Sequence, residues 1–106
     1  MKYHLDDENY LTINKKMAGH MISEHHRFYL DRELPSRCFI DEETPSSVSL
    51  MFTSDPGTDD VERAVEVISR AIRESYKTQV KEALKIAADY LRTLVEAQED
   101  DDDGSA

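Results

Sequence analysis

Apolar residues at helical spacing dominate the second half of the chain. Residues 59–98 contain no Gly and no Pro, and their apolar positions recur in steps of three and four. The nine steps of the main stripe cover 33 residues, a mean of about 3.67, which predicts a nearly straight amphipathic helix. The stripe consists of Val61, Val65, Ile68, Ile72, Tyr76, Val80, Ala83, Ala87, Leu91 and Leu94.

The bounds of this helix follow from local signals. Thr58 is a suitable N-cap, and Asp59 and Asp60 fall in the first turn, where the helix dipole favours negative charge. Ser75 and Thr78 compete for backbone hydrogen bonds, so a hairpin with legs 59–74 and 79–97 is the alternative. We favour one helix over 59–98, because a tight turn between helices usually carries Gly, Asn or Pro.

The first half of the chain predicts short strands around one helix. Residues 3–5 and 10–13 are β-prone and flank a polar turn, while 37–41 and 47–54 read as two further strands. Asn14 is a candidate N-cap for a helix over 15–33 that Pro35 terminates. We therefore expect a single α+β domain over 1–98, with an antiparallel sheet of about four strands, one short helix and the long C-terminal helix or hairpin. Residues 99–106 read as a disordered acidic tail.

Charge narrows the classes of partner. Of the 106 residues 34% are charged, and the net charge is −10. An acidic surface repels phosphates, which argues against direct binding to nucleic acid or an anionic membrane. The N-terminus shows no signal peptide, no apolar run is long enough for a membrane span, and Cys38 is the single cysteine. These features favour a soluble, cytoplasmic protein.

Two acidic clusters form a candidate patch and support an alternative function. A surface rich in carboxylates can imitate the phosphates of a nucleic acid, so the chain could inhibit a DNA- or RNA-binding enzyme, as a phage or mobile-element protein. Turns are also acidic for ordinary reasons of solvation, which is the simpler interpretation. The candidate patch consists of Asp6, Asp7, Glu8, Asp41, Glu42 and Glu43.

Catalytic and metal-binding signals are weak. His20 and Glu24 are spaced i, i+4, so on the expected helix they share a face, and a metal site there is the third hypothesis. His25 lies on a different face, and the order of these residues lacks the H-E-x-x-H pattern of zinc proteases. Cys38 reads as a buried structural thiol. We expect no enzyme activity, no cofactor, no metal and no small-molecule ligand.

The leading interpretation is a non-enzymatic interaction module. The apolar stripe is longer than a domain of this size needs, so we expect it to serve both the core and an interface, either in a homodimer or with another protein. A basic row at Lys77, Lys81 and Lys85 is either a ridge for an acidic partner or a solvated helix face. The partner and the pathway are not encoded in any motif.

Overall fold

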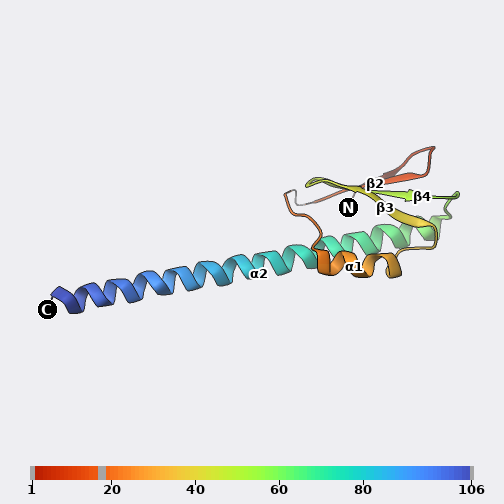
Figure 1. The fold of residues 1–106 in the computed structure, drawn as a ribbon. Helices are drawn as coiled ribbons and strands as arrows, with labels where there is room; N and C mark the ends of the chain where they lie inside the picture. Colours follow the sequence, from red (N-terminus) through yellow and green to blue (C-terminus); the bar gives the residue numbers. More distant parts are fainter. Residues whose placement is uncertain (1, 17–18, 106) are drawn as a thin grey trace. The chain divides into compact units, whose positions relative to one another are not determined.

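The computed structural model describes residues 2–16 and 19–105, and their side chains as far as residue 98. Along the chain it contains β1 (Tyr3–Leu5), β2 (Tyr10–Asn14), α1 (Glu24–Glu33), β3 (Cys38–Glu43), β4 (Ser47–Phe52) and α2 (Thr58–Ser105) (Figure 1). This order confirms the predicted α+β class.

The four strands form one antiparallel sheet in the order β1-β2-β4-β3. Leu11 lies opposite Leu50 and Ile13 opposite Val48, and because opposed residues share a face, the two central strands turn one apolar row toward the helices. All four side chains are fully buried. As predicted, side chains along the fourth strand alternate between the buried face of the sheet and the other face.

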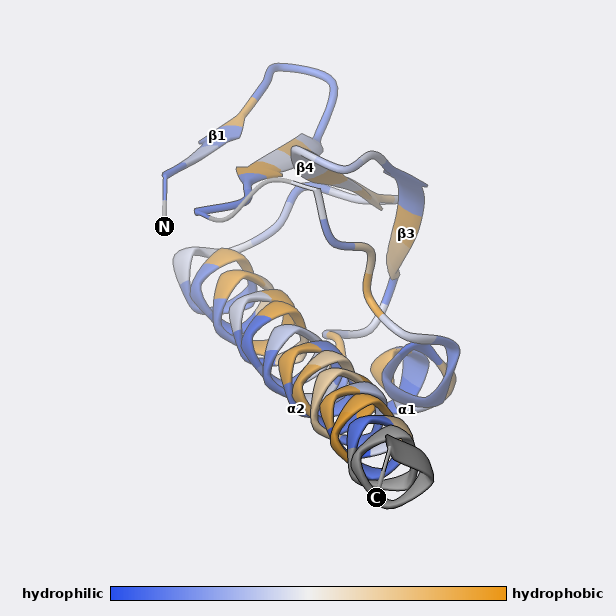
Figure 2. Cartoon of the chain, turned by 90° about the vertical axis from the view of Figure 1, so that its left-hand side faces the viewer, coloured by the Kyte–Doolittle hydropathy of each residue, from blue (hydrophilic) through white to orange (hydrophobic). Residues whose placement is uncertain are grey.

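α1 and the first part of α2 cover this face of the sheet (Figures 1 and 2). The buried side chains Ala64, Val67, Ile68 and Ala71 come from α2, and Leu30 comes from α1. A helix presents one apolar face at steps of three and four, which is the spacing of these α2 residues. The first half of the predicted apolar stripe therefore packs in the core of the chain itself.

α2 is one continuous helix of 48 residues, which excludes the hairpin. Contacts divide the chain into two compact units, residues 1–76 and 77–106. The single domain expected over 1–98 stays a prediction. The boundary follows Ser75, the last fully buried residue of α2 among those described. The helix assignment runs to Ser105, while the side chains of 99–106, the expected disordered tail, lie outside the described residues.

α1 is shorter than the predicted helix over 15–33. It begins at Glu24, and Ser23 rather than Asn14 is its N-cap, with Ser23 Oγ accepting a hydrogen bond from the backbone N–H of His26. Gly19 has φ +102°, a left-handed conformation that no α-helix contains. The backbone N–H of Gly19 also donates to Pro45 at 2.9 Å, so this segment follows the sheet instead of coiling.

A buried ion pair holds this non-helical segment in place. Lys15 Nζ lies 2.7 Å from Glu43 Oε2, and their side chains are 0% and 2% exposed. The same ammonium donates to the carbonyl of His20 at 2.7 Å, and the same carboxylate oxygen accepts from the backbone N–H of Ile22 at 2.7 Å. Arg27 approaches the second oxygen of Glu43 at 3.6 Å. The pair therefore ties Lys15, His20 and Ile22 together at described positions that are not helical.

We predict that Glu43→Gln destabilises the protein by about 3–5 kcal/mol, because it leaves the Lys15 ammonium buried without a counter-charge. Urea unfolding measures the loss, and adding Lys15→Met should restore most of it. The matched control is Glu42→Gln on the same strand, where the side chain is exposed, with a change below about 0.5 kcal/mol. Equal effects of the two Glu→Gln variants would show that the ion pair is not structurally important.

Candidate functional site

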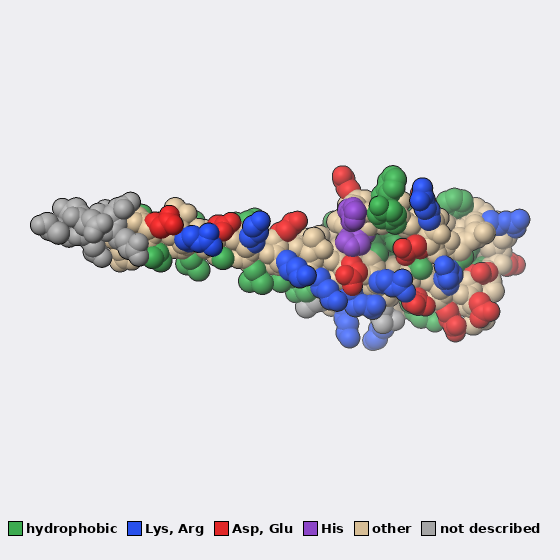
Figure 3. Space-filling model, turned by 90° about the horizontal axis from the view of Figure 1, so that it is seen from below, with side chains coloured by type: hydrophobic (Ala, Val, Ile, Leu, Met, Phe, Trp, Pro, Cys, Tyr) green, Lys and Arg blue, Asp and Glu red, His purple; other side chains and the backbone are tan. Residues whose placement is uncertain are grey.

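The second half of α2 carries large apolar side chains that no described part of the chain covers. Every residue from 81 to 98 is exposed. Among them Leu84 is 65%, Tyr90 63%, Leu91 60% and Leu94 48% exposed. Figure 3 shows hydrophobic side chains along one edge of this part of α2. We call the set the α2 apolar face: Val80, Ala83, Leu84, Ala87, Tyr90, Leu91, Leu94 and Val95.

Charged residues stay off this face. At about 100° per residue, the α2 apolar face occupies one side of the helix, and Glu82, Lys85, Asp89 and Arg92 fall on the other. Asp89 and Arg92 approach each other at 3.8 Å on that polar side, where both are exposed. An exposed pair of this kind contributes little stability. The helix is therefore solvated on one side and apolar on the other, which is the pattern of a helix that packs against something.

The structure divides the ten predicted stripe residues into two groups. Val61, Ile68 and Ile72 are buried and Val65 is partly buried, all in the core of residues 1–76. Tyr76 is half-buried, and its ring lies edge-on to that of His20, with centroids 5.0 Å apart. The other five, which are Val80, Ala83, Ala87, Leu91 and Leu94, belong to the α2 apolar face.

The ten-residue stripe did not include four large exposed apolar residues of this helix, which are Leu84, Ile86, Tyr90 and Val95. Ile86 is 69% exposed and Val95 is 53% exposed. Val95 follows Leu91 by four positions, a helical step that could have placed it on the stripe from the sequence. Ile86 lies between the apolar and polar sides, although it follows Ala83 of the stripe by three positions.

The six residues of the predicted acidic patch do not come together. Asp6, Asp7 and Glu8 lie in the turn before β2, and Asn9 Nδ2 of that turn donates to Asp55 Oδ1 at 2.9 Å. This hydrogen bond brings Asp55, not the other predicted cluster, next to the turn.

The second half of the predicted patch lies on β3, the opposite edge strand from β1. Asp41 and Glu42 are exposed there, but Glu43 is buried in its pair with Lys15. Its charge is therefore compensated inside the protein, and the six carboxylates do not form one continuous surface.

The predicted metal residues lie on different structural elements. Glu24 is the first residue of α1, whereas His20 lies before the helix and packs on Tyr76. The i, i+4 geometry expected of them needed a helix that the structure does not contain at residue 20. Within the described residues, no group of three or more His, Cys, Asp and Glu could hold a metal ion.

A serine–histidine cluster joins α1 to α2. Ser23 Oγ lies 2.6 Å from His26 Nδ1, and Ser75 Oγ lies 3.3 Å from the same nitrogen. Such a hydroxyl–imidazole contact is also found in hydrolases, where the imidazole is the base. Here Ser23 caps the helix, and its backbone N–H donates to the buried Ser75 Oγ at 3.0 Å. We interpret the cluster as a structural joint between the two helices.

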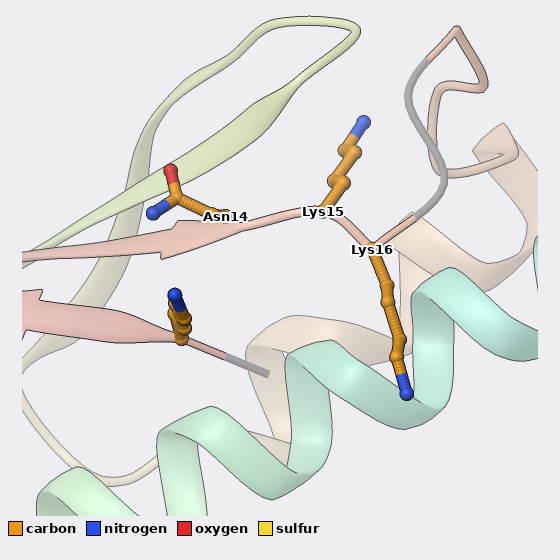
Figure 4. A pocket seen from close by; sticks show the side chains of 4 residues that line it. Asn14, Lys15 and Lys16 are labelled. Carbon is orange, nitrogen blue, oxygen red and sulfur yellow. The ribbon is translucent and has the colours of Figure 1, made fainter.

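A basic pocket of about 430 Å³ is lined by Lys2, Asn14, Lys15 and Lys16 (Figure 4). Lys15 and Lys16 point in opposite directions from neighbouring positions, and the Lys15 amine is already bound to Glu43. An anion site needs cationic groups that converge on one point. This pocket does not provide that arrangement.

Cys38 is a protected thiol. It is buried at the start of β3, and burial, with a smaller contribution from the charge of Asp60, raises its pKa from 9.0 to about 11. The reactive form of cysteine is the thiolate, so this side chain is unreactive at neutral pH. The expectation of a buried structural thiol agrees with its position.

Comparison of the chain with models of protein families, with curated proteins and with solved structures found no match. Among the described residues, no helix combines the length and the apolar character that crossing a membrane requires. The α2 apolar face is therefore interpreted from its own geometry.

We predict that Cys38 makes folding stability fall above pH 9. The folded pKa of about 11 exceeds the unfolded value of 9.0, so the protonated thiol stabilises the fold fully below pH 9, and this contribution disappears as the pH rises through 11. Urea unfolding at pH 8 and pH 10.5 should show a loss larger in the natural chain than in Cys38→Ala, by on the order of 1 kcal/mol.

All other ionisable groups are identical in the two proteins, so their effects cancel in this comparison. Two results would contradict the protected thiol: an identical pH dependence in the two proteins, or rapid alkylation of native Cys38 at pH 8.

Proposed function

We propose that the protein is a non-enzymatic interaction module that associates with further copies of itself through the α2 apolar face. The proposal rests on the large apolar side chains from Leu84 to Val95, which are about half to two-thirds exposed. Every residue of α2 from 81 to 98 is exposed, so the described chain does not bury these side chains. Exposed apolar surface of this extent indicates an interaction site.

Helix energetics support the proposal. Most of the stability of a helix in a protein comes from packing of its apolar face, and isolated helices are marginal in water. Residues 81–98 are all exposed and so lack such packing within the described chain. Burying a side chain of the size of Leu contributes about 1.5–3 kcal/mol, so partners for Leu84, Leu91 and Leu94 would stabilise this helix substantially.

A second copy suits this face better than a charged partner. The α2 apolar face consists of aliphatic residues and one tyrosine, with its charges on the opposite side, so two such faces can bury each other without burying charge. Closed homo-oligomers are also the commonest assemblies of soluble proteins. Because the net charge is −10, copies of the protein repel one another and non-specific aggregation is disfavoured. Specific contact between copies would therefore occur through the apolar face.

We predict that Leu91→Glu weakens self-association by more than about tenfold, because a carboxylate would be buried among apolar side chains. Analytical ultracentrifugation over a concentration series measures the effect. The matched control is Thr93→Glu, which adds the same charge on the polar side of α2, where Thr93 Oγ1 donates to the Asp89 carbonyl.

The natural chain and Thr93→Glu should associate alike, and Leu91→Glu should sediment as a monomer. A natural chain that remains monomeric at high micromolar concentration overturns the proposal. Equal association of all three proteins would show that the contact lies elsewhere.

A further inference from the structure

We propose that the α2 helices of two copies pair in antiparallel orientation, with Leu84 of one copy against Leu94 of the other. This inference rests on the proposed function, since it specifies how the α2 apolar face meets its second copy. The inference concerns only residues 77–98. It does not depend on the number of copies in the assembly, provided that their α2 helices meet in pairs.

Two rows of residues line the centre of the face. Val80, Ala87 and Leu94 are seven residues apart and form the first row. The second row contains Leu84 and Leu91, and Lys77 and Gln98 lie one interval of seven before and after them, beyond the ends of the face. Alternating steps of four and three between the rows are the spacing of helices that pack in pairs. In a parallel pair each residue meets its own copy, whereas in an antiparallel pair it meets the other row.

Side-chain size favours the antiparallel arrangement. A parallel pair would place Ala87 against Ala87 between two layers of leucine, which leaves a gap in the seam. The antiparallel arrangement places Ala87 against Leu91 and Leu84 against Leu94, so each alanine packs against a leucine and the two alanines do not share a layer.

Charge favours the same arrangement. Lys77 lies one interval of seven before Leu84, so a parallel pair would bring two ammonium groups together. Beyond the described side chains, the sequence continues with five acids at 99–103, and parallel pairing would gather those negative charges at one end as well. Antiparallel pairing separates both sets of like charges.

Antiparallel pairing also opposes the two helix dipoles, whereas parallel pairing would place like ends side by side.

Disulfide exchange between two single-cysteine variants tests the orientation. Cys38→Ala provides a background without a thiol, because Cys38 is the single cysteine. Into it are placed Leu84→Cys in one protein and Leu94→Cys in another. The two proteins are mixed and equilibrated in a glutathione buffer, so that the products report stability rather than the rate of trapping.

Antiparallel pairing predicts that the disulfide between positions 84 and 94 exceeds each homodisulfide by more than about tenfold, ~1.4 kcal/mol. In either variant alone the two thiols would then be about 15 Å apart along the helix, too far for a disulfide. Homodisulfides that form readily in each variant alone, with no preference for the mixed product, would overturn the antiparallel assignment and leave self-association standing.

Sedimentation of the reduced variants distinguishes the two hypotheses. Reduced proteins that associate, together with the mixed disulfide, support the inference. If the natural chain and both reduced variants are monomers, the proposed function fails, and the inference fails with it.

Discussion

The structure depends on a difference in length between the sheet and its longest helix. The strands of the centre and of the β3 edge have five or six residues, and at about 3.3 Å per residue a six-residue strand spans about 20 Å. At about 1.5 Å per residue this corresponds to about 13 residues of helix. α2 has 48 residues. The sheet and α1 can therefore bury only the first part of its apolar stripe, and the remainder is available to something outside the chain.

The buried pair between Lys15 and Glu43 fixes how the chain passes from the sheet to α1. Charges removed from water are stable only when their partners are well placed, and here the pair also satisfies the His20 carbonyl and the Ile22 N–H. This arrangement explains why the described residues 15–16 and 19–23 do not extend α1 despite their helical spacing. The pair also buries the carboxylate of Glu43, which the sequence placed in the acidic patch. It occupies the buried amine of Lys15, which lines the basic pocket, so both groups serve the fold.

The α2 apolar face, which we propose as an interaction surface, and the core use the same kind of residue, so the sequence alone does not distinguish them. Ile72 and Leu91 stand on one stripe with one periodicity, yet the first is buried and the second is 60% exposed. What separates them is contact with strands that lie far away in the chain. The same reasoning applies to the acids: Asp55 meets the turn at Asn9 through a hydrogen bond between residues 46 positions apart, which no local pattern indicates.

The sequence by itself determined the α+β class, the strand that alternates from Ser47 to Phe52, and a single long helix that begins at Thr58, because propensity, capping and periodicity are local properties. Only the tertiary structure decided where α1 begins, because Gly19 and the Lys15–Glu43 pair depend on strands β3 and β4. It also decided which half of the α2 stripe is core, since burial is set by how far the sheet reaches and not by the spacing of the residues.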